Sequence, residues 1–146
     1  MRYLCYVATD SNKRISITNM AKKILIIEDD EDNLKLFSTM LKSHGYETLQ
    51  ARSSMEGIRL AKTEKPNLII TDIQMPVMDG FEAFKIMKSD PSTKDIPYIV
   101  ITPYGVRGAR EKFLKLGFVD YIAKPFDMHK FIRIVNKHLY GGASAE

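Results

Sequence analysis

The sequence predicts an α/β fold in which five helices cover a five-stranded parallel sheet, an open doubly wound architecture. Two observations predict it. From Lys22 onward, short apolar runs alternate with longer segments of helical period. Three of the short runs are apolar at nearly every position, as in strands that are buried on both faces. Strands and helices that alternate in this way build parallel sheets through right-handed crossovers.

The apolar runs place the strands. We predict strands at 23–27 (KILII), 46–50 (YETLQ), 67–71 (NLIIT), 98–102 (YIVIT) and 119–123 (VDYIA). The first, third and fourth are apolar at nearly every position, so they belong inside the sheet. The second alternates polar and apolar residues, which favours an edge position.

Amphipathic segments follow each run. The first predicted helix contains Leu34 to Leu41 and ends at Gly45, a suitable left-handed residue after a helix. Its successors are predicted at 54–63, 80–89 and 107–116, and Gly117 closes the last of these. The fifth helix carries apolar residues at helical spacing from Met128 to Leu139.

The composition fits one soluble domain. The chain has 146 residues, 45% hydrophobic and 27% charged, and no apolar run approaches the roughly 20 residues of a membrane span. The single Cys5 cannot form an internal disulfide, so we expect a cytoplasmic protein. We divide the chain into an N-terminal extension (1–19), one domain (20–141) and a short tail (142–146).

The charge is modestly basic. The net charge of +4 is too small to indicate nucleic-acid binding. Between Tyr104 and Tyr140, however, the sequence contains eight Lys and Arg residues and only three acids. These cations are either solvated helix faces or a docking surface for an acidic partner.

Polar residues gather where the predicted strands end. Acids follow the first strand (Glu28, Asp29 and Asp30) and the third (Asp72), whereas Thr102 ends the fourth and Lys124 follows the fifth. Each alone is ordinary, because acids before a helix commonly cap it. The carboxyl ends of parallel strands meet at one edge, so we expect these side chains to converge there.

Converging carboxylates point to a cation. Unit charges ~4 Å apart repel by about 4 kcal/mol at an effective dielectric constant near 20. Such a cluster either raises a carboxyl pKa or binds an ion, and oxygen ligands without His or Cys select Mg²⁺ or Mn²⁺. A metal beside Asp72, with Lys124 as a second cation, would hold a phosphoryl group, and Asp72 would be the nucleophile.

Four motifs carry a resemblance to a known family. ILIIEDD, IITDIQMPVMDG, IVITP and DYIAKPF occur in an order and spacing that resemble the receiver domains of two-component response regulators. The resemblance covers about residues 22–140. It implies a flavodoxin-like sheet with strand order 2-1-3-4-5.

The resemblance implies a role for each residue of the acidic cluster. Asp72 matches the aspartate that accepts the phosphoryl group. Asp29 matches a direct Mg²⁺ ligand, and Glu28 matches an acid that acts mostly through water. The backbone carbonyl of Gln74 would complete the metal site.

Further positions match residues that respond to the phosphoryl group. Thr102 resembles the hydroxyl that moves onto it, and Lys124 the lysine that pairs with it. Tyr121 resembles the aromatic switch that reports on Thr102. Gln74 and Tyr104 occupy the positions expected to tune the lifetime of the acyl phosphate, and a bulky Tyr104 predicts slow autodephosphorylation.

The sequence departs from the family after Thr102. The residue there usually donates its backbone N–H to a phosphoryl oxygen, but Pro103 has none. Such a charge-assisted bond is worth roughly 1.5–3 kcal/mol. We therefore expect weaker coupling between phosphorylation and the active state.

The implied function is a stand-alone receiver that takes its phosphoryl group from a sensor histidine kinase or a histidine phosphotransfer protein. It would signal to a protein target through its fourth helix, fifth strand and fifth helix, as a monomer or a phosphorylation-dependent dimer, without contacting nucleic acid or membrane. It would catalyse only its own phosphotransfer and dephosphorylation.

Two alternatives stay open. In the first, the missing N–H of Pro103 impairs phosphorylation, and the chain acts only as an interaction module. A metal-dependent phosphatase of the haloacid dehalogenase type is disfavoured, since it needs a second aspartate where this chain has Gln74.

Overall fold

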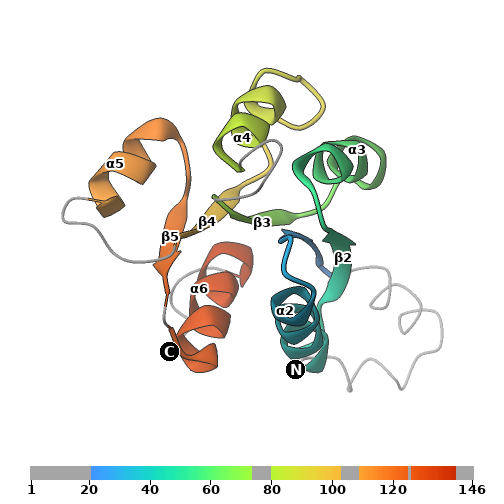
Figure 1. Ribbon diagram of the computed structural model, residues 1–146, viewed down its shortest axis with the longest axis vertical. Helices are drawn as coiled ribbons and strands as arrows, with labels where there is room; N and C mark the ends of the chain where they lie inside the picture. Colours follow the sequence, from blue (N-terminus) through green and yellow to red (C-terminus); the bar gives the residue numbers. More distant parts are fainter. Residues whose placement is uncertain (1–20, 74–79, 103–108, 125, 141–146) are drawn as a thin grey trace.

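The computed structural model describes residues 21–73, 80–102, 109–124 and 126–140, in which strands and helices alternate (Figure 1). The extension at 1–19 and the tail at 142–146 lie outside these residues. Within the described ranges, no helix is both long and apolar enough to cross a membrane.

The sheet has five parallel strands. They are β1 (Lys23–Ile27), β2 (Glu47–Ala51), β3 (Leu68–Asp72), β4 (Tyr98–Thr102) and β5 (Asp120–Ala123). Their order is β2-β1-β3-β4-β5, with every neighbouring pair parallel. The predicted fold class, strand order and edge position of the second strand are therefore confirmed.

Five helices cover the two faces of the sheet. They are α2 (Glu31–Ser43), α3 (Ser54–Glu64), α4 (Gly80–Lys88), α5 (Ala109–Leu116) and α6 (Met128–Tyr140). Helices α2 and α6 lie on one face, and α3, α4 and α5 lie on the other (Figure 1). Residues alternate between the two faces along each strand, so every strand of the interior supplies both cores.

Local signals set the helix ends. The Asp30 side chain caps α2 by accepting a hydrogen bond from the Asn33 amide at 3.0 Å, and Ser53 caps α3 in the same way. Gly45, after α2, has φ 90°, and Gly117, after α5, has φ 117°. Only glycine adopts such angles without strain, so both predicted helix ends are confirmed.

Three strands begin one residue later than predicted. Tyr46, predicted as the start of a strand, instead packs into the core beside α2, and its amide donates to the Leu41 carbonyl at 3.1 Å. The side chain of Asn67 accepts from the Lys23 amide at 2.8 Å, outside β3. Asp72 is consequently the last residue of β3 rather than the first residue after it.

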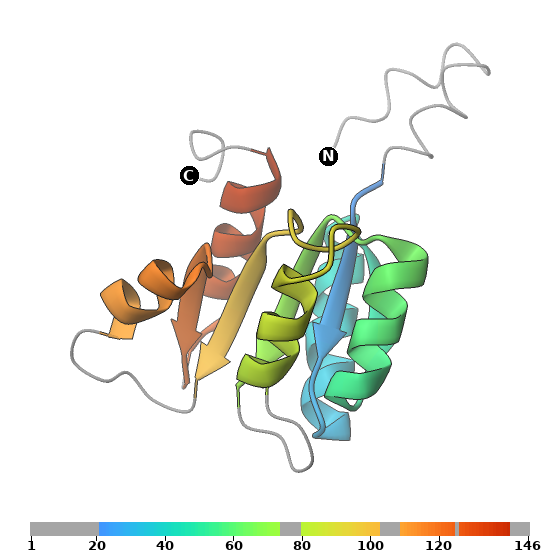
Figure 2. The same cartoon turned by 90° about the horizontal axis from the view of Figure 1, so that it is seen from above.

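The strand register aligns the carboxyl ends of the strands. Ile27 lies opposite Ala51 and Thr71, Asp72 opposite Ile101, and Thr102 opposite Ala123. The strands run in the same direction (Figure 2). The residues at and after these ends therefore share one edge of the sheet.

Candidate functional site

Three carboxylates meet at the carboxyl edge of the sheet. One oxygen each from Glu28, Asp29 and Asp72 lies within 4.8 Å of the others. Glu28 and Asp72 are buried, with 2% and 6% of their surface exposed, and Asp29 is half-buried. The predicted convergence of acids from the first and third strands is thus present in the structure.

The acids that follow β1 do different things. Asp30 is exposed and caps α2, as described above, so it belongs to the helix and not to the cluster. Glu28 stays in line with the sheet because its amide donates to the Ala51 carbonyl of β2 at 3.0 Å. Of the two roles predicted for these acids, Asp30 has the helix-capping role, and Glu28 and Asp29 have the role in the cluster.

Glu28 is the member of the cluster whose charged form is disfavoured. Burial raises its pKa to about 7, although the Asp30 amide, which donates to Glu28 Oε2 at 3.1 Å, opposes the shift. The negative charge of Asp72 raises the pKa further. The other oxygen, Oε1, is buried without a hydrogen-bond partner among the described residues. A buried acceptor without a hydrogen-bond partner lowers the stability of the fold by about 1–3 kcal/mol, and a bound cation would remove that cost.

Lys124 supplies a cation from the far side of β4. Its Nζ lies 3.2 Å from Asp72 Oδ2, although 52 positions separate the two residues in sequence. Its amide donates to the Thr102 carbonyl at 2.8 Å, which anchors the residue at the end of the sheet. The sequence-based expectation that Lys124 faces Asp72 is borne out by this contact.

The donor set fits a hard divalent cation. All three groups offer carboxylate oxygens, and Mg²⁺ prefers oxygen ligands while keeping several waters. The orphaned Glu28 oxygen and the raised pKa show a site with more negative charge than the protein itself neutralises. A divalent ion would supply positive charge there, and the residues present fit Mg²⁺.

Thr102 and Tyr121 lie on neighbouring strands. Thr102 ends β4, 8% exposed and one residue beyond Ile101, the partner of Asp72. Tyr121 of β5 lies opposite Val100, and strand alternation puts it on the same face of the sheet as Thr102. Its half-buried ring lies 6.1 Å from that of Phe113 on α5.

Other predicted positions lie outside the described residues. These are the proposed carbonyl ligand and lifetime residue Gln74, the second lifetime residue Tyr104, and Pro103. Their predicted roles stay predictions.

The sequence did not reveal a third buried acid, outside the cluster. Asp120, 3% exposed at the start of β5, lies 3.0 Å from His138 Nε2 and 4.0 Å from Lys137 Nζ of α6. An acid inside the apolar run VDYIA was the available signal. Its partners were not foreseeable, because they depend on how α6 packs.

Known proteins share both the sequence and the fold. The family model described as "Response regulator receiver domain" matches residues 24–136. A curated relative, the polar-differentiation response regulator DivK of Brucella ovis, is 38% identical over 120 residues, covering 82% of this chain and 98% of the relative. The DivK proteins of Brucella suis and Brucella abortus match equally well.

Solved structures agree. The chemotaxis response regulator CheY4 of Vibrio cholerae superposes with a TM-score of 0.76 at 25% identity, over 82% of this chain and all of that one. The receiver domain of the sensor histidine kinase PA1611 from Pseudomonas aeruginosa, solved with a magnesium ion in its active-site cleft, gives 0.72 at 30% identity, over 80% and 96%. Family model, relatives and geometry coincide, and the chain belongs to the family of response regulator receiver domains.

Proposed function

We propose that this receiver domain accepts a phosphoryl group on Asp72, with Mg²⁺ held by Glu28, Asp29 and Asp72. The observation that carries the proposal is the buried Asp72 carboxylate between a cluster of acids and the Lys124 ammonium, 3.2 Å away. A magnesium structure of a relative that is 30% identical supports the metal. Bound there, Mg²⁺ would neutralise negative charge on the carboxylates and the incoming phosphoryl oxygens.

The proposed chemistry is a phosphoryl transfer between side chains. An oxygen of Asp72 attacks the phosphorus of a phosphohistidine; the new O–P bond forms as the N–P bond breaks, and the donor imidazole leaves. Lys124 then pairs with the phosphoryl oxygens in place of the Asp72 oxygen. Thr102, on the adjacent strand end, supplies a hydroxyl to the same group.

The signal would leave through α5, β5 and α6. Movement of Thr102 toward the phosphoryl group opens space on the face that it shares with Tyr121, and Tyr121 packs against α5. Among the residues of α5 and α6 whose exposure the structure describes, five cations are exposed and one acid, Glu111; the exposed Asp127 directly precedes α6. The cations are Lys112, Lys115, Lys130, Arg133 and Lys137. This balance favours an acidic protein target.

The partners follow from the family. Receiver domains take their phosphoryl groups from histidine kinases, and we propose a sensor kinase or a histidine phosphotransfer protein as the donor here. The monomer or phosphorylation-dependent dimer and the cytoplasmic location stay predictions.

Intact-mass measurement after incubation with acetyl phosphate and Mg²⁺ tests the proposal. We expect the wild type to gain the mass of one phosphoryl group, and the Asp72→Asn variant or a sample with EDTA to gain none. Asp120→Asn, the other buried aspartate, serves as the matched control and should still be modified. A wild type that stays unmodified would overturn the proposal and favour the interaction module with impaired phosphorylation.

A further inference from the structure

Strand β2 lies at an edge of the described sheet. Among the described residues it pairs only with β1, toward which the Glu47 amide donates and the Ala51 carbonyl accepts. In a parallel strand the backbone groups of successive residues point to opposite sides. The N–H and C=O groups of Thr48 and Gln50 therefore point away from β1, toward the free edge.

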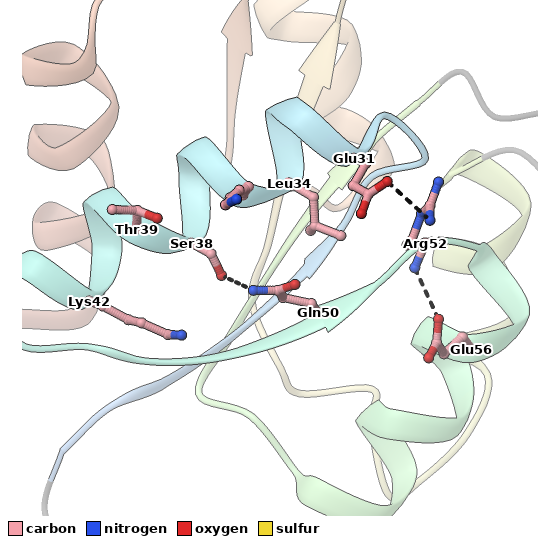
Figure 3. Close-up of a pocket in the computed structure, with 9 residues that line it drawn as sticks. Glu31, Leu34, Ser38, Thr39, Lys42, Gln50, Arg52 and Glu56 are labelled. Carbon is pink, nitrogen blue, oxygen red and sulfur yellow. Dashed lines mark hydrogen bonds and ion pairs between the residues drawn. The ribbon is translucent and has the colours of Figure 1, made fainter.

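A groove of about 530 Å³ runs beside this edge, between α2 and β2. Figure 3 shows Thr39 and Lys42 of α2 alongside the strand, with Arg52 at its end. Gln50 Nε2 donates to the buried Ser38 hydroxyl of α2 at 2.7 Å, which fixes the helix over the strand. The groove thus has α2 along one side, and Gln50 of β2 with Arg52 beyond the strand on the other.

The unmet charge in the groove is positive. Three cations, Lys35, Lys42 and Arg52, line it against two acids. Glu31 Oε1 lies 3.7 Å from Arg52 Nη1, and Glu56 Oε1 accepts a hydrogen bond from the neutral Arg52 amide at 3.0 Å (Figure 3). Lys35 and Lys42 also line the groove, are exposed, and have no ion-pair partner in the described part of the chain.

We propose that the β2 edge binds an extended acidic peptide of a partner protein, which adds a strand to the sheet. The outward amides and carbonyls of Thr48 and Gln50 would pair with the peptide backbone, and Lys35 and Lys42 would bind its acidic side chains. This interface lies apart from Asp72 and does not require its phosphorylation. Strand addition of this kind takes affinity from backbone bonds and specificity from alternate side chains.

The two faces of the edge define the peptide. Thr48 and Gln50 point their side chains toward α2, since both contact the Ser38 hydroxyl, whereas the half-buried Leu49 packs in the core on the α3 face. A strand placed alongside meets lysines on one face and the half-buried Leu49 on the other. Lys35 and Lys42 are seven residues apart, which is about 10 Å along the helix. Side chains on one face of a strand are about 7 Å apart, so two acids at alternate positions of the peptide can each reach one of these lysines. The expected ligand therefore alternates acidic and apolar residues.

Fluorescence anisotropy of a labelled peptide of about eight residues, alternating glutamate and valine, tests the proposal on the full chain. We expect saturable binding, and none for a peptide with lysine in place of glutamate. Reversing both lysines, Lys35→Glu with Lys42→Glu, should weaken binding by about tenfold or more. The matched reversal of two exposed lysines in and after α4, Lys85→Glu with Lys94→Glu, should leave it unchanged.

A proline variant isolates the backbone contribution. Gln50→Pro removes an amide that β1 does not use, so the sheet keeps its ladder while the edge loses a donor. Gln50→Ala is the control, because it loses the same side-chain bond to Ser38 but retains the amide. We expect about a tenfold loss for Gln50→Pro and less than about threefold for Gln50→Ala.

Amide hydrogen exchange gives a readout that needs no variant. The Thr48 and Gln50 amides should exchange quickly in the free wild type and slowly with the peptide bound, whereas Leu49 should be protected in both. Absent binding, equal binding of the lysine peptide, or unprotected Thr48 and Gln50 amides in the complex would overturn the proposal. So would a dimer in sedimentation that Gln50→Pro dissolves, since a second copy would then occupy the edge. Asp72→Asn should bind the peptide normally, which separates this test from that of phosphorylation.

Discussion

Two buried aspartates lie at opposite ends of the sheet, and each lies beside a basic side chain. Asp72 ends β3 at the carboxyl edge, 6% exposed, with Lys124 Nζ at 3.2 Å. Asp120 begins β5 at the amino edge, 3% exposed, with His138 Nε2 at 3.0 Å. Burial and pairing alone would not distinguish them.

Their surroundings differ. Both oxygens of Asp120 have partners, since Oδ1 accepts from the Tyr121 amide at 2.9 Å and Oδ2 meets His138. Asp72 instead shares its surroundings with two more carboxylates, and an oxygen of Glu28 there lacks a partner within the described ranges. A buried charge whose bonds are complete holds the fold together, whereas a concentration of like charge with incomplete bonds is built for a ligand.

The largest effect that can break this comparison is on stability. Asp120→Asn should lower the free energy of unfolding by about 2–3 kcal/mol, because it weakens hydrogen bonds to a buried charged group. Asp72→Asn should change it by less than about 1 kcal/mol or raise it, because the loss of the Lys124 pair is offset by relief of repulsion among the acids. Urea unfolding of both variants without metal measures the difference. Equal losses would show that the two aspartates have the same structural role.

The pH dependence of stability sharpens the comparison at the carboxyl edge. The pKa of Glu28 rises from an ordinary 4.5 to about 7 in the folded protein. Below 4.5 the carboxyl is protonated in both states; between 4.5 and about 7 the unfolded chain releases the proton while the folded protein keeps it. Rising pH therefore favours unfolding across that window, by an amount on the order of 2 kcal/mol.

Urea unfolding in EDTA at several pH values checks this effect. The free energy of unfolding of the wild type should fall as the pH rises from 4.5 to about 7, because Glu28 ionises. The Glu28→Gln variant has no group that ionises at this position and should lack this fall. Glu56→Gln, an acid outside the cluster, is the control and should keep the wild-type slope. A Glu28→Gln variant with the same slope as the wild type would contradict the assigned cause.

The two aspartates also differ in how far the sequence foretold them. The Asp72 site was predictable because a topological rule applies: parallel strands with right-handed crossovers bring their carboxyl ends to one edge, whatever the helices do in detail. The Lys124 contact followed from the same rule. The strand boundary at Asp72 was one residue off, since the exposure of Asn67 and its bond to Lys23 were invisible in an apolar pattern.

No such rule predicts the Asp120 contact. It depends on the placement of the last turn of α6 against the first residue of β5, and helical periodicity identifies the buried face of a helix without fixing its depth along the sheet. The edge position of β2 was predicted from alternation. That Lys35 and Lys42 beside it have no ion-pair partner within the described ranges could be seen only from the structure.

The smallest effect concerns the apolar packing beneath the acidic cluster. Gly57 of α3 lies so close to β1 that an added Cβ would come within 2.4 Å of Ile27 Cδ1 and 2.8 Å of Cγ1. Overpacking costs about 1–3 kcal/mol, and the higher helix propensity of alanine returns about 1 kcal/mol. Gly57→Ala should therefore destabilise the protein by about 1 kcal/mol, unless Ile27 is shortened.

A double-mutant cycle isolates that contact. Ile27→Val removes Cδ1, so the cost of Gly57→Ala should fall or change sign in the Ile27→Val background, as urea unfolding would show. An unchanged cost in both backgrounds would mean that α3 does not press on the end of β1. Ile27 directly precedes Glu28, so the same displacement should alter the Glu28-dependent pH slope while Asp72 phosphorylation persists. The pKa of Glu28 would then depend on the close contact between α3 and β1 at Gly57 and Ile27. The charge at Asp120, by contrast, is stabilised by its own hydrogen bonds.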